Sequence, residues 1–135
     1  MQYQHLTQSI IGSAMRVHSI LGNGFQEVIY QRALALEFAN NKLPFRREFE
    51  MDIFYQKQKI GARRVDFLVA ETIMVELKAL IQLEDVHLAQ AKNYLEVSHK
   101  QIGLLINFGA RRLEFKRIFN NRPPCLNQDF QDLPD

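Results

Sequence analysis

The sequence predicts an α+β domain in which a central mixed sheet is flanked by helices. Three observations support this fold class. Two N-terminal segments have apolar residues at helical spacing, an alternating strand is followed by two strongly apolar strands, and a later helix returns the chain to one more apolar strand. The order α-α-β-β-β-α-β is typical of a sheet with helices packed on its faces.

The two N-terminal helices are separated by the sequence LGNG at residues 21–24. Apolar residues recur on one face over 3–20, which predicts the first helix. Glycine ends helices and asparagine tolerates turns, so LGNG predicts a stop and a new start. The second helix is expected over about 25–41 and ends before Pro44.

The strands are predicted from alternation and from apolar runs. Residues 46–55 place apolar side chains (Phe49, Met51, Ile53, Tyr55) on one side and acids on the other, as in a half-buried strand. Polar residues 56–59 predict a turn. The remaining expected elements are strands over 60–70 and 72–79, a helix from Glu84-Asp85 to Ser98, and strands over 102–108 and 115–119.

Composition places the chain among ordinary globular proteins. The 135 residues are 47% apolar and 24% charged, and no apolar run approaches the roughly 20 residues that span a bilayer. The N-terminus lacks the pattern of a secretory signal. A single cysteine, Cys125, excludes an internal disulfide and indicates a cytoplasmic location. We expect one domain over 1–121 and a Pro-rich, acidic tail over 122–135.

The formal net charge of +2 hides a local concentration of basic residues. Several adjacent pairs of bases lie between or beside the predicted strands, and such pairs suit contacts with phosphates. A solvated basic surface is the alternative explanation for each pair. The pairs taken as candidates for nucleic-acid binding are Arg46-Arg47, Arg63-Arg64 and Arg111-Arg112.

The most informative stretch is VDFLVAETIMVELKAL at residues 65–80, where three charges interrupt apolar strands. A hairpin turn centred on Glu71 places Asp66 opposite Glu76, with Cβ atoms about 5 Å apart. A divalent cation would offset the repulsion between these carboxylates. Lys78 follows Glu76 by two residues and therefore shares its face of the strand. A structural ion pair between Glu76 and Lys78 is the simpler alternative.

Two helices carry further polar candidates. Gln90 and Tyr94 lie four residues apart on one helix face, where an amide and a phenol can orient a substrate or a bound water. His87 shares that face and is of secondary interest. Upstream, Glu27 and Tyr30 share a face at the start of a helix, and Glu27 there is equally explained by the helix dipole.

These segments resemble the PD-(D/E)XK nuclease superfamily and, within it, the small bacterial GxxExxY proteins. The resemblance covers about residues 8–119. The segments that carry it are HSILGNGFQEVIY (18–30), VDFLV (65–69), IMVELKAL (73–80), HLAQAKNYL (87–95) and GLLINFG (103–109). Asn23 stands where the family often has proline, and Val65 precedes Asp66 where the superfamily often has proline.

The resemblance implies an αβββαβ core with its site on the central hairpin and the first core helix. Asp66, Glu76 and Glu27 would bind Mg²⁺ or Mn²⁺, and Lys78 would position the attacking water and stabilise the transition state. Gln90 and Tyr94 would support the site, as in the RecB-like nucleases.

The expected function is therefore metal-dependent hydrolysis of phosphodiester bonds in nucleic acid, with DNA as the expected substrate. Two alternatives remain open from the residues. One is a non-catalytic nucleic-acid-binding or accessory module that keeps the nuclease fold. The other is a protein-interaction domain, for which a homodimer through exposed strand edges is one form. If the carboxylates repel each other, replacing either one is expected to stabilise the metal-free protein.

Overall fold

A computed structural model of the chain describes residues 2–121 and has the predicted order of elements. The elements are α1 (Gln2–Leu21), α2 (Glu27–Asn40), β1 (Phe45–Tyr55), β2 (Gln58–Val69), β3 (Ile73–Lys78), α3 (Asp85–Val97), β4 (Ile102–Asn107) and β5 (Glu114–Phe119). The fold class predicted from the sequence is thus confirmed. The tail predicted over 122–135, with Cys125, lies outside the described residues.

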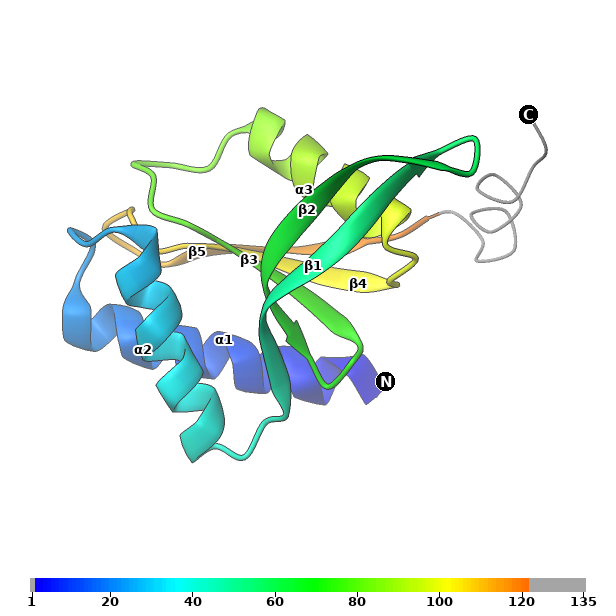
Figure 1. Cartoon of the computed structure of the whole chain (residues 1–135). Helices are drawn as coiled ribbons and strands as arrows, with labels where there is room; N and C mark the ends of the chain where they lie inside the picture. The colour runs from blue at the N-terminus through cyan, green and yellow to red at the C-terminus, as the bar shows by residue number, and fades with distance from the viewer. Residues whose placement is uncertain (1, 122–135) are drawn as a thin grey trace.

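The five strands form one mixed sheet in the order β1-β2-β3-β4-β5. β3 and β4 are parallel, and the other neighbours are antiparallel. A parallel pair needs a crossover connection, and α3 supplies it. Helices α1 and α2 cover one face of the sheet while α3 lies on the other (Figure 1).

The larger core lies between the sheet and helices α1 and α2. Ile10, Ala14 and Val17 form the buried stripe of α1, at the spacing that an amphipathic helix requires. Tyr30 of α2 stacks on Phe108, the residue directly after β4, with ring centroids 4.6 Å apart. This core is mainly apolar, with Thr7, Ser13 and Gln31 as the buried polar residues of the two helices that cover it.

The smaller core lies between the sheet and α3. It includes Met51, Val65 and Met74 from the strands and Leu95 from α3. Side chains alternate between the faces of a strand, so Glu76 follows Met74 onto this face while Val75 and Leu77 enter the larger core. Glu76 therefore lies on the α3 face of the sheet.

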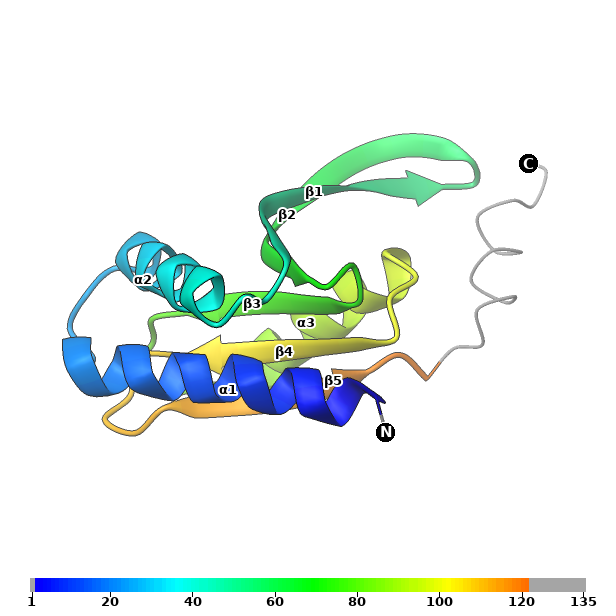
Figure 2. The same ribbon diagram turned by 90° about the horizontal axis from the view of Figure 1, so that it is seen from below.

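The far parts of β1 and β2 form a two-stranded arm, residues 49–64, that leaves the rest of the sheet (Figure 2). β2 pairs with β3 only from Phe67↔Val75 to Val69↔Ile73, although β1 and β2 stay paired to Tyr55↔Gln58. On the arm, Met51 is buried against α3 but Tyr55 is 56% exposed. The half-buried strand predicted over 46–55 is therefore buried only near its base.

The turn at the tip of the arm is shorter than predicted. Gln56 and Lys57 both have positive φ, at 47° and 69°, as in a two-residue type I′ hairpin loop. β2 consequently begins at Gln58 rather than at residue 60. The sequence prediction was wrong here because the loop lacks the asparagine and glycine that usually mark such a turn.

Within residues 2–121, the structure has no helix both long enough and apolar enough to cross a bilayer.

Candidate active site

Asp66 lies where the strand pairing of β2 is broken on both sides. Pairing with β1 passes from Arg47↔Phe67 to Phe49↔Val65, and pairing with β3 stops at Phe67↔Val75. Glu48, the residue skipped on β1, has φ of 54°, which is uncommon for a residue other than glycine. The hairpin register predicted from the sequence is confirmed, but its ladder ends one pair before Asp66 and Glu76.

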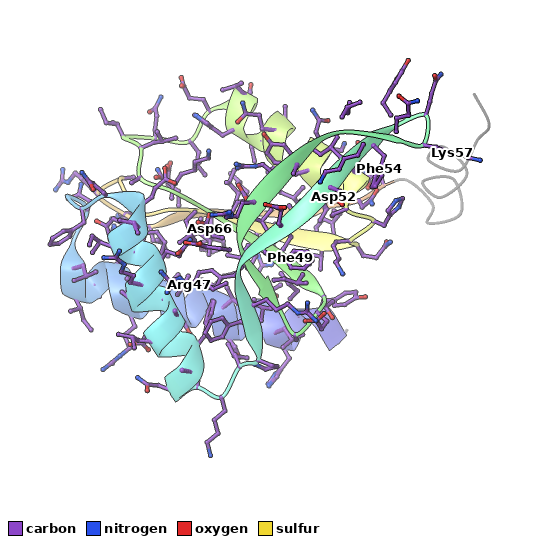
Figure 3. The ribbon with its side chains drawn as sticks, in the orientation of Figure 1. Arg47, Phe49, Asp52, Phe54, Lys57 and Asp66 are labelled. Carbon is purple, nitrogen blue, oxygen red and sulfur yellow. The ribbon has the colours of Figure 1, made fainter. Side chains whose placement is uncertain are left out.

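The broken pairing frees the Asp66 carboxylate to accept two hydrogen bonds. Its Oδ2 accepts from the backbone N–H of Leu77 at 2.8 Å, and its Oδ1 accepts from Nε2 of Gln31 at 2.7 Å. The Oε1 of Gln31 accepts in turn from Nε of Arg47 at 2.8 Å. Asp66 and Arg47 lie close to the point where the arm leaves the sheet (Figure 3). This chain of contacts fixes Asp66 against both β3 and α2.

Glu76 lies deeper and has fewer partners. Its side chain is only 4% exposed, and its Oε2 forms an ion pair with Nη2 of Arg63 at 2.7 Å. Its Oε1 is buried without a hydrogen-bond partner among the described residues. The Arg63 guanidinium also lies over the ring of Tyr94, 4.5 Å from the centroid. The structure thus brings Tyr94 of α3 to the site, through Arg63.

Burial dominates the electrostatics of Glu76. Desolvation raises the pKa of Glu76 from 4.5 to about 7, although Arg63 opposes the shift, and the nearby Asp66 adds to it. A carboxyl group with this pKa is partly protonated near neutral pH, and a bound cation would displace that proton.

Glu27 and Lys78 belong to the same cluster. Desolvation raises the pKa of Glu27, Lys78 opposes this shift, and Asp66 adds to it. Lys78 also lowers the pKa of Glu76. Asp66 and Lys78 thus act on the pKa of both Glu27 and Glu76, as charges do when they lie near the titrating group.

The end of β3 is held in place by residues from β4 and β5. Asn107, fully buried, accepts a hydrogen bond from the Leu80 N–H and donates one to the Leu80 carbonyl. Its amide also donates to Oε1 of Glu114 at 2.8 Å. A Cβ on Gly109 would lie 2.4 Å from the Leu80 nitrogen, so only glycine fits there. These contacts fix the backbone directly after Lys78.

Three helical candidates have other roles or other positions. Gln90 is exposed on α3, and no hydrogen bond joins it to the site within residues 2–121. His87 accepts a hydrogen bond from the Glu84 N–H through Nδ1 at 3.0 Å and so caps α3. The hydroxyl of Tyr30 donates to the Gly22 carbonyl at 2.6 Å and accepts from the Phe25 N–H. Tyr30 therefore shapes the loop before Glu27.

The predicted basic pairs divide into different environments. Arg63 and Arg47 take part in the site, as described above. Arg46 pairs with Glu71 at 2.6 Å, and Arg64 pairs with Glu48 at 3.6 Å, all at the surface. Arg111 and Arg112 are exposed in the loop before β5 and form no ion pair within the described part of the chain.

Sequence reasoning missed Gln31, the residue that links Asp66 to Arg47. It is 6% exposed on α2, one turn after Glu27 and among apolar neighbours. A buried amide needs hydrogen-bond partners. The position of Gln31 on the same helix face as Glu27 was therefore the sequence feature that could have indicated a role in the site. Asn107 and Glu114 were also missed, because their role depends on strand neighbours far away in the sequence.

The residues present suit a hard divalent cation. Carboxylate oxygens are its preferred ligands, and the Asp66 carboxylate lies near both Glu76, whose Oε1 has no partner among the described residues, and Glu27. No group of three His, Cys, Asp or Glu side chains is already arranged as a metal site within residues 2–121. Mg²⁺ commonly uses one or two carboxylates and keeps several waters, so a preformed triad is not required.

Comparison with known proteins establishes the family. The family model described as the PD-(D/E)XK nuclease superfamily matches residues 4–118, and the chain belongs to this superfamily. A solved structure titled "Crystal structure of SSO0001" is similar, with a TM-score of 0.57 and 18% identity over 80% of this chain. The match spans 60% of that protein's chain and supports the fold alone. No curated protein matches the chain significantly.

Proposed function

We propose that the protein is a metal-dependent nuclease that hydrolyses phosphodiester bonds, with its site at Asp66, Glu76 and Lys78. The observation that carries the proposal is the buried Glu76, with one oxygen unpartnered, beside Asp66 and Lys78. Buried polar atoms usually have hydrogen-bond partners, so this oxygen and the Nε of Arg63 favour a site that binds a further group. Superfamily membership supports the same reaction.

Each residue has a proposed role. Asp66 and Glu76 hold Mg²⁺ or Mn²⁺, with Glu27 as a third carboxylate. A bound divalent ion supplies Lewis acidity and lowers the pKa of a water. Lys78 positions that water and stabilises the charge on the phosphate. Tyr94 supports Arg63 through its ring. Gln90 is exposed on α3 one turn before Tyr94, and its proposed role is to contact the substrate and not the metal.

The finer assignments also belong to the proposal. The quoted GFQEVIY segment supports membership of the GxxExxY group, with Tyr30 as the residue that shapes the loop before Glu27. DNA in the cytoplasm is the proposed substrate, and the basic residues Arg46, Arg64, Arg111 and Arg112 are proposed to contact its backbone. Such contacts give affinity without reading sequence.

The test is cleavage of labelled single-stranded DNA, double-stranded DNA and RNA with Mg²⁺ or Mn²⁺. An EDTA control and a Lys78→Ala protein prepared identically accompany it. We expect metal-dependent cleavage that falls by at least about a hundredfold in the variant, the scale for loss of one transition-state stabilising group. Activity that survives in Lys78→Ala would show that the chemistry lies elsewhere.

Binding measurements distinguish a nuclease from a non-catalytic nucleic-acid-binding module. That module would bind nucleic acid equally well in EDTA and with metal, and would cleave nothing under any condition. For a protein-interaction domain, substitution of Asp66 or Glu76 would change stability without any metal-dependent effect.

A further inference from the structure

Arg63 is the cationic side chain that pairs with Glu76. The guanidinium donates through Nη2 to Oε2 of Glu76 at 2.7 Å, and its charge lowers the pKa of this carboxyl group more than the charge of Lys78 does. The pair is incomplete, because Nε of Arg63 and Oε1 of Glu76 are both buried without hydrogen-bond partners within residues 2–121. Arginine and carboxylate groups more often pair through two parallel hydrogen bonds.

Arg63 also has a second contact that does not depend on Glu76. Its guanidinium lies 4.5 Å from the centre of the Tyr94 ring, a geometry that favours cation–π attraction. The Arg63 side chain is 32% exposed, whereas that of Glu76 is 4% exposed. Arg63 therefore reaches from the buried carboxylate to the solvent side of the site, where a phosphate would arrive.

We propose that Arg63 is an exchangeable counter-cation that couples metal binding to substrate binding. Without metal it neutralises Glu76. When a metal takes Glu76, the guanidinium stays over Tyr94 and binds the phosphate of the nucleic acid. This inference rests on the proposed function and adds to it the order in which metal and phosphate engage the site. Arg63 is then a positioning residue for Glu76 and a ligand for phosphate.

Two consequences follow from competition for one carboxylate. Arg63 weakens metal binding, because the ion must displace a charge-assisted hydrogen bond. A phosphate that draws Arg63 away from Glu76 strengthens metal binding, and the metal strengthens phosphate binding by the same factor. A permanent structural ion pair would have neither effect.

The experiment is calorimetric titration of Mg²⁺ and of Ca²⁺ into wild type, Arg63→Met and Lys59→Met proteins. Lys59 is the matched control, since it is a basic residue of the same strand, β2, that pairs with Asp52 on the arm. We expect Arg63→Met to bind metal roughly tenfold more tightly, the order of one charge-assisted hydrogen bond. Lys59→Met should keep the wild-type metal affinity.

A second titration with a short single-stranded DNA present tests the coupling. In wild type the oligonucleotide should tighten Ca²⁺ binding several-fold, and in Arg63→Met this gain should disappear while DNA binding in EDTA weakens. Arg63→Lys, which keeps the charge but loses the planar guanidinium, should bind metal with intermediate affinity. Circular dichroism and thermal melting would confirm that each variant is folded.

Two results would overturn the inference. Unchanged or weaker metal binding in a folded Arg63→Met protein would show that Arg63 does not compete for Glu76. If the oligonucleotide tightens Ca²⁺ binding equally in wild type and Arg63→Met, Arg63 does not couple metal binding to phosphate binding. If wild type nevertheless cleaves DNA, only this inference fails. If no variant binds metal and none cleaves, the proposed nuclease function fails with it.

Discussion

Asp66 and Glu76 lie on adjacent strands of one hairpin, but their surroundings differ. Asp66 has a donor for each oxygen, the Gln31 amide and the Leu77 N–H. Glu76 has one cationic partner and one buried oxygen without a partner. The raised pKa of Glu76 follows from this difference, because burial penalises a charge that few contacts compensate.

The difference indicates a division of labour. Asp66 has a structural role. Backbone pairing between β2 and β3 stops at Phe67↔Val75, and the Asp66 side chain then accepts the hydrogen bond of the Leu77 N–H. Burial disfavours the charged form of Glu76, and its contacts compensate this cost only in part. We therefore expect the charge of Asp66 to stabilise the fold and the charge of Glu76 to destabilise it, and three predictions test this comparison.

The largest expected effect is the pH dependence of stability that Glu76 causes in the metal-free protein. Its pKa is about 7 in the folded state and near 4.5 when unfolded, so the folded state binds more protons between these values. Stability should then fall as pH rises through this range, by at most roughly 3 kcal/mol. Chemical denaturation in EDTA at pH 4.5, 6 and 8 measures the trend.

Glu76→Gln is the variant that isolates this contribution. It keeps an oxygen for Arg63 but cannot ionise, so its stability should vary less with pH than that of wild type over the same interval. An identical slope in both proteins would assign the pH dependence to other groups.

Asp66→Asn should have the next largest effect. Both Asp66 oxygens accept hydrogen bonds, so an amide NH₂ in place of one oxygen would face a donor. We expect a loss of about 2 kcal/mol in the free energy of unfolding, measured in urea without metal. Asp52→Asn, at an exposed acid that pairs with Lys59 on the arm, is the control and should change stability much less. Stabilisation by Asp66→Asn would contradict our view of Asp66.

Gln31→Met should have the smallest effect of the three. It removes the partner of Asp66 Oδ1 and of Arg47 Nε while preserving the side-chain length. A loss of about 1 kcal/mol is expected. Gln90→Met, on the exposed side of α3, should leave the unfolding free energy unchanged. Equal stabilities of the two variants would mean that Gln31 does not support Asp66.

The sequence predicted the elements well because their patterns are local. Alternation, helical spacing and the glycines at 21–24 placed every helix and strand of the described chain to within about two residues. The register of the β2–β3 hairpin was predicted from one assumed turn, and its residues Ala70 and Glu71 do have positive φ. The clustering of Glu27, Asp66, Glu76 and Lys78 follows from that register and from the motif.

The surroundings of each charge were not predictable in the same way. Sequence alone suggested that Asp66 and Glu76 repel, so that losing either one would stabilise the protein. The contacts of Asp66 with Gln31 and Leu77 reverse that expectation for Asp66, and they arise from a break in two ladders that no local pattern indicates. The partner of Glu76 was likewise hidden, since Arg63 looked like part of a surface pair.

The support beneath Lys78 has a consequence for how the protein is made. Asn107 and Gly109 fix the backbone at Leu80, and they enter the chain about thirty residues after Lys78. A nascent chain that ends before β4 already contains both carboxylates and the lysine, but lacks the strand on which β3 aligns. The contacts at Leu80 cannot form before residues 107–109 have been synthesised. We expect the geometry around Lys78 to arise only when nearly the whole domain has left the ribosome.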